Sequence, residues 1–215
     1  MASSNNAAWV VTGGNRGIGL GFVKALIARP SVTVIATRRR RNLVYCPIGL
    51  HHRAPPDQIR KLFDIDHILS CARDPDRRPP LRLRDQYNRP ADGRSWALAL
   101  VAKSSAPKVV NVSSSVGCIT YHEVVAGAYG PSKAALNWIT RALHLQNESL
   151  VAFALHPGFV NTEMGESAAT EWGFPHAMLG GVEEAVKGSL GIIDSATREN
   201  VSGKFVSYKG QELPW

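Results

Sequence analysis

Apolar and polar positions alternate along the first forty residues in the rhythm of two short strands and one helix. Ala7–Thr12 is a short apolar run that ends in glycines, and Ile18–Ala28 has the apolar spacing of a helix. Pro30 ends that helix, and the β-branched stretch Val32–Thr37 favours a buried strand. The apolar residues of the helix share one broad face: Leu20, Phe22, Val23, Leu26 and Ile27. The order predicts a βαβ unit.

The same rhythm returns after residue 100. Strands are expected at Lys108–Ser113, Leu150–Leu155 and Lys204–Ser207, and helices at Pro131–Gln146 and Val182–Asp194. Strands that alternate with helices predict a parallel sheet covered on both faces. The expected fold is therefore α/β, a Rossmann-type doubly wound parallel sheet in a single domain over residues 1–215.

The stretch between these halves breaks the pattern. Residues 38–104 are atypical and basic, and only Ile59–Leu69 has helical character. Too few apolar residues recur at period 2 or 3.6 to specify two further strand–helix units. We expect irregular structure and low order here, with the third and fourth strands of the sheet poorly specified.

Length and composition set the class of protein. A chain of 215 residues with 44% hydrophobic residues suits one globular domain. No apolar run approaches the roughly 18–20 residues that span a bilayer, and the first residues resemble no secretory signal. Three scattered cysteines are typical of reduced thiols. The expected location is the cytoplasm, with no membrane partner.

The net charge of +8 is concentrated in one segment. Residues 38–94 hold 14 Lys/Arg and 7 Asp/Glu, whereas the remainder holds 11 and 10. No nucleic-acid motif accompanies this charge, so a solvated surface is favoured over a nucleic-acid or membrane-surface binder, and no nucleic-acid partner is expected.

A glycine motif follows the first strand and opens the first helix. Glycines in such a turn let the backbone approach a pyrophosphate, and the helix N-terminus supplies free N–H groups. An ordinary glycine-rich turn is the alternative for a lone match. The expected cofactor-binding residues of this motif are Thr12, Gly13, Asn15, Arg16, Gly17, Ile18 and Gly19.

The residues after the second strand indicate which dinucleotide is bound. An NAD site usually has an acidic residue there, but this chain has Arg38 and Arg39. Arginines would pair with a 2′-phosphate, and Arg16 favours the same cofactor, so NADP(H) is expected. A solvated basic loop is the alternative interpretation.

Tyr129 and Lys133 lie one helical turn apart and can share a face. An ammonium near a phenol favours phenolate, which makes Tyr129 a plausible proton donor to a carbonyl oxygen. Asn111–Ser114 ends a central strand, where open α/β sheets bind ligands, and Ser114 could hydrogen-bond a substrate carbonyl. Ordinary turn chemistry is the alternative for this serine run and for Pro157–Thr162.

Together these motifs resemble the short-chain dehydrogenase/reductase family over roughly residues 7–37 and 105–215. Tyr129-Gly130-Pro131-Ser132-Lys133 and His156-Pro157-Gly158 are most similar to fungal norsolorinic acid ketoreductase-type enzymes. The resemblance implies a catalytic set of Ser114, Tyr129 and Lys133, with Ser113 or Ser115 as less favoured substitutes for Ser114. It also implies further cofactor contacts from Asn111, Tyr129, Lys133, Pro157, Gly158, Val160 and Thr162.

The implied activity is NADP(H)-dependent reduction of a ketone, with Tyr129 as general acid. The substrate would be a small-molecule ketone, by analogy with those enzymes an aromatic polyketide of secondary metabolism, and no metal is expected. The segment Glu163–Gly181 has apolar and aromatic residues that suit a planar substrate or a loop that packs its own core.

Residues 38–104 depart from the family pattern. The family's acidic residue after the third strand, its Asn-Ala-Gly turn and its catalytic Asn have no recognisable counterpart, and Pro90 falls near that Asn position. A reading-frame or splicing change is one hypothesis. A homo-oligomer stays open as a partner, although the departure puts the family's helix-mediated dimer in doubt. It also keeps open a catalytically dead relic or scaffold as the alternative function.

Overall fold

The computed structural model describes residues 7–37, 43–45, 51–53, 67–71, 101 and 104–215. The helices and 3₁₀ turns have these bounds: α1 Gly17–Ile27, η1 Ser115–Gly117, α4 Tyr129–Gln146, α5 Glu163–Trp172, η2 His176–Met178 and α6 Val182–Asp194. The strands have these: β1 Ala7–Thr12, β2 Val32–Thr37, β3 Leu43–Tyr45, β4 His51–Arg53, β5 His67–Cys71, β6 Lys108–Val112, β7 Val151–His156, β8 Phe205–Ser207 and β9 Glu212–Leu213.

The strands form one sheet in the order β4-β3-β2-β1-β5-β6-β7-β8-β9. The six central strands, β2-β1-β5-β6-β7-β8 in sheet order, are all parallel. Antiparallel strands extend both edges of the sheet, β3 and β4 beside β2 and β9 beside β8. The chain runs outward from β1 to β2 and returns to β5 on the other side of β1, so the strand order reverses between β1 and β5. Ligands of open α/β sheets bind outside the carboxyl ends of the strands at such a point.

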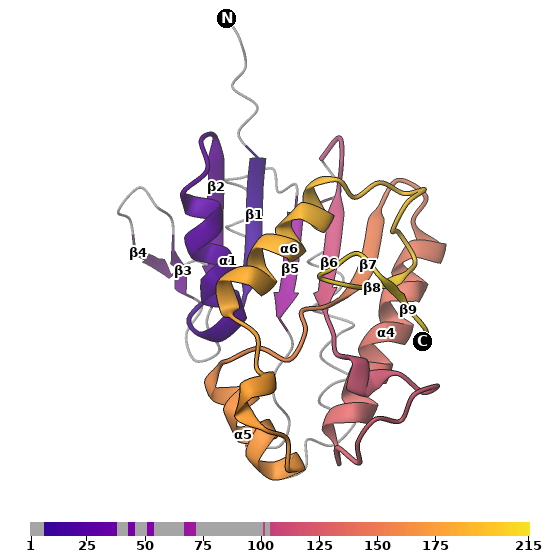
Figure 1. Ribbon diagram of the computed structural model, residues 1–215. Coiled ribbons are helices and arrows are strands. Elements are labelled where there is room, and N and C mark those ends of the chain that lie inside the picture. Colours follow the sequence, from indigo (N-terminus) through magenta and orange to yellow (C-terminus); the bar gives the residue numbers. More distant parts are fainter. Residues whose placement is uncertain (1–6, 38–42, 46–50, 54–66, 72–100, 102–103) are drawn as a thin grey trace, which may run out of the picture.

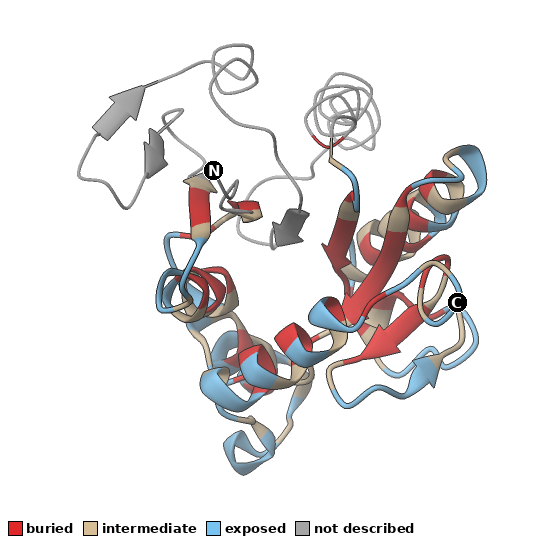
Figure 2. Ribbon diagram, turned by 90° about the horizontal axis from the view of Figure 1, so that it is seen from above, coloured by how far each residue is buried: buried red, intermediate tan, exposed pale blue. Residues whose placement is uncertain are grey.

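The two faces of β6 pack against different helices, because successive side chains of a strand point to opposite faces. Val110 and Val112 join the hydrophobic core formed with α1 and α6, in which Phe22, Leu26 and Ile193 have no exposed surface. Asn111 instead hydrogen-bonds Thr140 of α4, which places α4 on the opposite face. Figure 1 shows α1 and α6 in front of the sheet, and Figure 2 shows their buried faces turned toward the strands.

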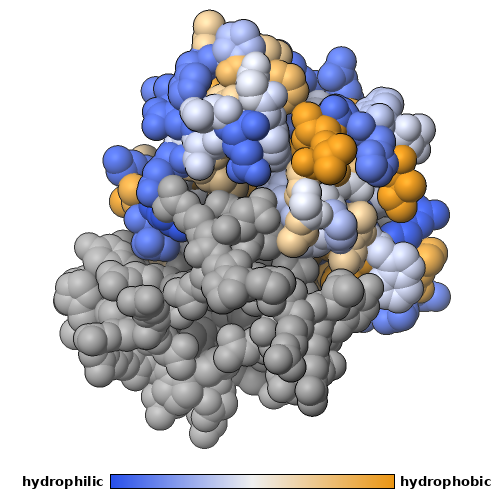
Figure 3. Space-filling view, turned by 90° about the horizontal axis from the view of Figure 1, so that it is seen from below, coloured by the Kyte–Doolittle hydropathy of each residue, from blue (hydrophilic) through white to orange (hydrophobic). Residues whose placement is uncertain are grey.

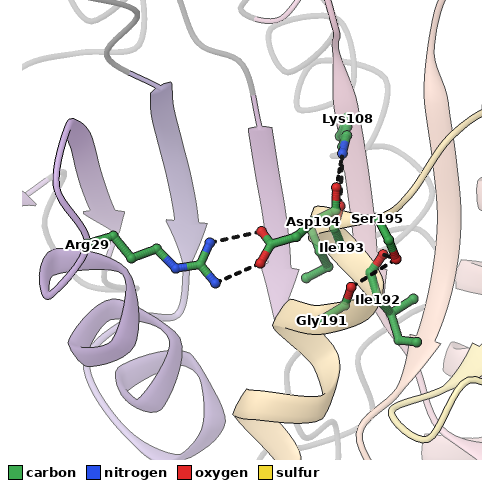
Figure 4. Close-up of polar contacts among 7 residues, drawn as sticks. All are labelled: Arg29, Lys108, Gly191, Ile192, Ile193, Asp194 and Ser195. Atoms are coloured by element: carbon green, nitrogen blue, oxygen red, sulfur yellow. Dashed lines mark hydrogen bonds and ion pairs between the residues drawn. The ribbon is translucent and has the colours of Figure 1, made fainter.

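Close contact between α1 and α6 depends on a glycine and an ion pair. A Cβ at Gly21 would lie 2.8 Å from a methyl of Val186, so a larger residue would push the helices apart. At the ends of the helices, Arg29 binds both carboxylate oxygens of Asp194, each at 2.8 Å. Lys108 of β6 donates to the carbonyl of Ile193 at 2.9 Å, which ties the sheet to the end of α6 (Figure 4).

Most predicted elements are confirmed outside the middle segment, with bounds within two residues. The structure differs at β3, β4 and β5, which lie where irregular structure is expected, and β5 begins within the predicted helical stretch Ile59–Leu69. The five residues of β5 are too few to establish a periodicity. Its pairing with β1 and β6 comes from residues distant in sequence. Tertiary pairing therefore decides a segment whose local pattern does not. The remainder of 38–104 lies outside the described residues, except Val101 and Ser104.

Candidate active site

The sequence-predicted residues gather at the carboxyl edge of the sheet. The glycine turn follows β1, Ser113 and Ser114 follow β6, and Pro157–Thr162 follows β7. Parallel pairing brings these strand ends to one side, where α5 also lies (Figure 1). Figure 3 looks onto the molecule from that side and shows hydrophobic side chains among hydrophilic ones on its described part.

The glycine turn is shaped by close backbone approach. Gly13 and Gly17 have φ values of 73° and 52°, a region that favours glycine. A Cβ at Gly19 would collide with the carbonyl oxygen of Gly13, so this helix residue must lack a side chain. Arg16, the N-cap of α1, makes no side-chain capping bond, and the first N–H groups of the helix are left for another acceptor. This geometry suits a phosphate group.

The segment after β7 lies against the glycine turn. A Cβ at Gly17 would be 3.5 Å from the methyl of Thr162, so the predicted contacts of the two motifs are neighbours in space. Thr162 caps α5 by accepting a hydrogen bond from the Gly165 N–H at 3.1 Å. Arg16 extends the contact through an ion pair with Glu163 at 2.9 Å, although both side chains are about three-fifths exposed, at 60% and 61%. Glu163 was not among the sequence-predicted site residues.

Lys133 is a buried ammonium beside a tyrosine ring. Only 3% of Lys133 is exposed, and its Nζ donates to the carbonyl of Val112 at 3.0 Å. The same Nζ lies 5.4 Å from the centroid of the Tyr129 ring, as the spacing of one helical turn predicts. A Cβ at Gly117 would come within 2.5 Å of the Lys133 Cβ, so glycine lets the loop after β6 pass close to this lysine.

The three serines after β6 have three different partners. Ser113 is buried and donates to the Asn137 Oδ1 at 2.6 Å, and Ser115 donates to Glu123 at 2.9 Å. Ser114 accepts a hydrogen bond from the Val116 N–H at 3.3 Å, the turn contact expected at a strand end. An O–H that accepts one bond can still donate another, so Ser114 keeps a donor for a carbonyl oxygen.

A row of buried polar residues on α4 continues below Lys133. Asn137 is 3% exposed and Thr140 has no exposed surface, and both face β6. Thr140 accepts a hydrogen bond from the Asn111 Nδ2 at 2.8 Å. The Nδ2 of Asn137 is buried and has no hydrogen-bond partner among the described residues. Sequence reasoning missed Asn137 and Thr140, although polar residues at 133, 137 and 140 share one helical face and were a usable signal.

His156, the last residue of β7, is held neutral. Its Nδ1 accepts a hydrogen bond from the Ser115 N–H at 3.3 Å. Burial, together with the smaller effect of the nearby Lys133 charge, lowers the pKa of His156 from 6.5 to about 4. An uncharged imidazole therefore lies between the Ser115 loop and Pro157 near neutral pH. The sequence offered only the His-Pro-Gly tripeptide as its signal.

Aromatic rings join Tyr129 to the segment after β7. The Trp172 centroid is 6.4 Å from that of Tyr129 and 6.4 Å from that of Phe159. Phe174 completes the cluster edge-on to both Phe159 and Trp172, at 6.1 and 6.4 Å. These contacts place Trp172 of the predicted flap beside Tyr129. Met178 of the same segment is 58% exposed.

Two of the predicted cofactor-binding residues fall outside what the structure describes. Arg38 and Arg39 lie outside the described residues. In the described part of the chain, no group of three or more His, Cys, Asp or Glu side chains could hold a metal ion. No helix among those residues is long and apolar enough to cross a bilayer.

Comparison with known families finds one match, in the second half of the chain. The family model described as short chain dehydrogenase matches residues 94–172, which include the serine run, Tyr129, Lys133 and Pro157–Thr162. This stretch covers β6, α4 and β7, and it includes all three predicted catalytic residues.

Curated relatives match nearly the whole chain. A short-chain dehydrogenase of Pyricularia oryzae is 28% identical over 255 residues, covering 99% of this chain and 100% of the relative. A norsolorinic acid ketoreductase of Dothistroma septosporum is also 28% identical over 255 residues, covering 99% of this chain and 94% of the relative. Because both alignments are longer than the 215 residues of the chain, each relative has segments that this chain lacks.

Solved structures share the fold. The NADPH-bound carbonyl reductase from chicken fatty liver superposes with a TM-score of 0.67 and 25% identity, over 98% of this chain and 99% of that one. The carbonyl reductase Sniffer of D. melanogaster has a TM-score of 0.69 and 22% identity. These likenesses confirm the Rossmann-type fold predicted from the sequence.

Proposed function

We propose that this chain, which is similar to short-chain dehydrogenases over nearly its whole length, is an oxidoreductase of that type that reduces a ketone with NADP(H), using Tyr129 as general acid. The observation that carries this proposal is the buried Lys133 ammonium, 5.4 Å from the Tyr129 ring centroid and hydrogen-bonded to the carbonyl of Val112, two residues before Ser114. Its relatives include ketoreductases and its structural neighbours are carbonyl reductases.

The glycine turn fits a dinucleotide. Its backbone leaves no room for a Cβ at Gly19, and the N-terminus of α1 has no side-chain cap, so a pyrophosphate would find free N–H groups there. Thr12, Gly13, Asn15, Gly17, Ile18 and Gly19 would surround that group. Asn111, Pro157, Gly158, Val160 and Thr162 would hold the nicotinamide end, where NADPH supplies a hydride to the carbonyl carbon.

In this mechanism the phenol of Tyr129 donates its proton to the carbonyl oxygen while the carbon accepts the hydride. The product is an alcohol, and the proton lost by Tyr129 is replaced from solvent. Lys133 favours the resulting phenolate through its positive charge. Ser114 orients the carbonyl by donating its hydroxyl hydrogen. The neutral His156 adds no second positive charge beside Lys133.

The aromatic cluster favours a planar, apolar substrate. Offset or tilted rings with centroids about 4.5–7 Å apart attract one another, and a flat aromatic ketone could join Trp172 and Tyr129 in the same way. The ketoreductase relative from Dothistroma septosporum is named for norsolorinic acid. We therefore assign the substrate to aromatic polyketide-type ketones of secondary metabolism, acted on in the cytoplasm.

Arginines support NADP(H) over NAD(H). Arg16 lies at the N-cap of α1 beside the glycine turn, where a guanidinium can bind phosphate oxygens in a bidentate fashion. Arg38 and Arg39 follow β2, at the sequence position where NAD-binding sites usually have an acidic residue. Neither of these two residues is described by the structure.

The test is oxidation of NADPH and of NADH by the purified chain, with fluorenone as a planar aromatic ketone and cyclohexanone as an aliphatic one. We expect fluorenone-dependent oxidation of NADPH, slower oxidation of NADH, and little with cyclohexanone. Folded protein that binds neither dinucleotide would contradict the proposal and favour a catalytically dead relic. Binding without turnover of any ketone would contradict the catalytic part alone.

A further inference from the structure

Two side-chain hydrogen bonds connect β6 to α4 directly beneath the candidate site. They join Ser113 to Asn137 and Asn111 to Thr140, at 2.6 and 2.8 Å. All four residues are at least 95% buried, so water does not compete for these bonds. Ser113 immediately precedes Ser114, and Asn137 lies one helical turn after Lys133, so the first bond adjoins both candidate catalytic elements.

The spacing of the partners fixes how the helix lies on the strand. Residues 111 and 113 point to the same face of β6 and are about 6.6 Å apart along it. Residues 137 and 140 share a face of α4 and are about 4.5 Å apart along its axis. The later residue of the strand, Ser113, pairs with the earlier residue of the helix, Asn137, so strand and helix run antiparallel at this contact. A shift of α4 by one turn along the strand would separate both pairs. The hydrogen bond from Lys133 to the carbonyl of Val112 joins α4 to the end of the same strand.

The hydrogen bond between Ser113 and Asn137 is accompanied by an unfavourable buried polar group, which packing alone does not explain. Whichever amide atom of Asn137 faces Ser113, the other remains buried without a partner among the described residues. A buried polar group without a partner is unfavourable, and replacing both partners of such a bond by apolar groups of similar shape can be neutral or stabilising. A leucine at 137 would suit the core equally well in size.

We propose that Asn137 is a positioning residue, whose hydrogen bond to Ser113 sets Ser114 against Tyr129 and Lys133. The inference rests on the proposed function, since it concerns the same reaction. Asn137 contacts neither substrate nor cofactor in this scheme. It acts through Ser113 and through the register of α4.

The test replaces both partners together, by Ser113→Ala with Asn137→Leu. We expect a folded variant with a Tm equal to or above that of the wild type and an unchanged Kd for NADPH. Its kcat for fluorenone should fall about 10-fold, the consequence of a displacement of reacting groups by a fraction of an ångström. Ser113→Thr keeps the hydroxyl and should restore most of the kcat when Asn137 is retained.

Ser202→Ala is the matched control, because Ser202 lies outside α4 and hydrogen-bonds a residue of that helix. Ser202 is buried and its hydroxyl hydrogen-bonds His144 of α4 at 2.8 Å, far along the helix from Lys133. Loss of this bond should lower the Tm and leave kcat unchanged. Should the double variant not fold, Ser113→Ala alone, which removes a single oxygen atom, has the same expected fall in kcat.

The outcomes separate the two proposals. An active wild type with an equally active double variant would overturn the positioning role and leave the proposed function intact. A fall in kcat with unchanged Tm and NADPH affinity would support it. A fall in kcat only in proportion to lost folded protein would overturn it in favour of a structural role. A wild type that oxidises no NADPH with fluorenone would reject the proposed function and the positioning role together.

Discussion

Two corners of the candidate site are built in contrasting ways. At the glycine turn, the shape of the backbone dominates: glycines adopt positive φ, and a Cβ at Gly19 has no space. At the corner between β6 and α4, buried side chains dominate, and Lys133 and Asn137 each have only 3% of their surface exposed. The first corner suits a ligand held by backbone N–H groups, and the second suits proton transfer.

The contrast implies different consequences of substitution. A side chain added at the glycine turn must move backbone, so stability and ligand binding should fail together. A polar side chain replaced at the β6–α4 corner can leave packing intact, so turnover should fail while the fold persists. Each prediction below tests one side of this division.

The largest effect is expected for Gly19→Ala. Overpacking costs typically about 1–3 kcal/mol, and here the added Cβ meets the Gly13 carbonyl rather than a flexible side chain. The affinity for NADPH should fall about 100-fold, the upper end of that range, and the Tm should fall as well. Fluorescence titration and thermal unfolding measure the two quantities.

Gly191→Ala is the matched control, because a Cβ there meets nothing within 4 Å. In a helix, alanine is about 1 kcal/mol more favourable than glycine, so this variant should be as stable as the wild type or more stable. If Gly19→Ala bound NADPH with wild-type affinity, the close approach of Gly19 to the Gly13 carbonyl would not be needed for binding.

An intermediate effect is expected for the pH dependence of stability. The pKa of His156 is lowered to about 4 in the folded chain, mainly by burial, and returns to about 6.5 on unfolding. The unfolded chain therefore binds more protons between these values, and stability is lost as pH falls from about 6.5 toward 4. From pH 7 to pH 5 the loss from this residue is about 2 kcal/mol.

Urea unfolding at both pH values measures that loss. His156→Gln removes the titrating group and should lose about 2 kcal/mol less than the wild type over the same interval. Equal losses in the two proteins would mean that His156 titrates alike in the folded and unfolded chains, and that the β6–α4 corner does not keep it neutral.

The smallest effect is expected for Arg16→Ala. Exposed ion pairs contribute about 0–1 kcal/mol, so loss of the Arg16–Glu163 contact should change the Tm by little. If Arg16 also binds the 2′-phosphate, the affinity for NADPH should fall several-fold and that for NADH should not. Lys24→Ala, at an exposed position of α1, is the control. A large drop in Tm would show that the Arg16 side chain stabilises the glycine turn, contrary to the account in which the backbone alone shapes it.

The sequence predicts some strands and helices well and others not at all, for a physical reason. The bounds of β1, β2 and α6 follow from local apolar patterns and are confirmed residue for residue. β5 could not be predicted, because five residues held by pairing on both edges need no periodicity of their own.

The chemistry divides in a similar way. Tyr129 and Lys133 could be predicted as a pair from the spacing of one helical turn, and the lysine lies beside the ring. The partners Ser113 and Asn137 are 24 residues apart, and only the packing of α4 on β6 brings them together. Roles that depend on such long-range pairs are not readable from spacing.

The measurement that tests the central claim most directly is Tyr129→Phe, which removes one oxygen atom from the β6–α4 corner. The account predicts that the affinity for NADPH, measured by fluorescence titration, falls at most a few-fold, because the glycine turn is untouched and only one of the expected cofactor contacts loses its hydroxyl. It also predicts that kcat for fluorenone falls about 10²–10⁴-fold, the usual contribution of a general acid. Turnover at the wild-type rate, with NADPH still bound, would contradict the assignment of proton transfer to Tyr129.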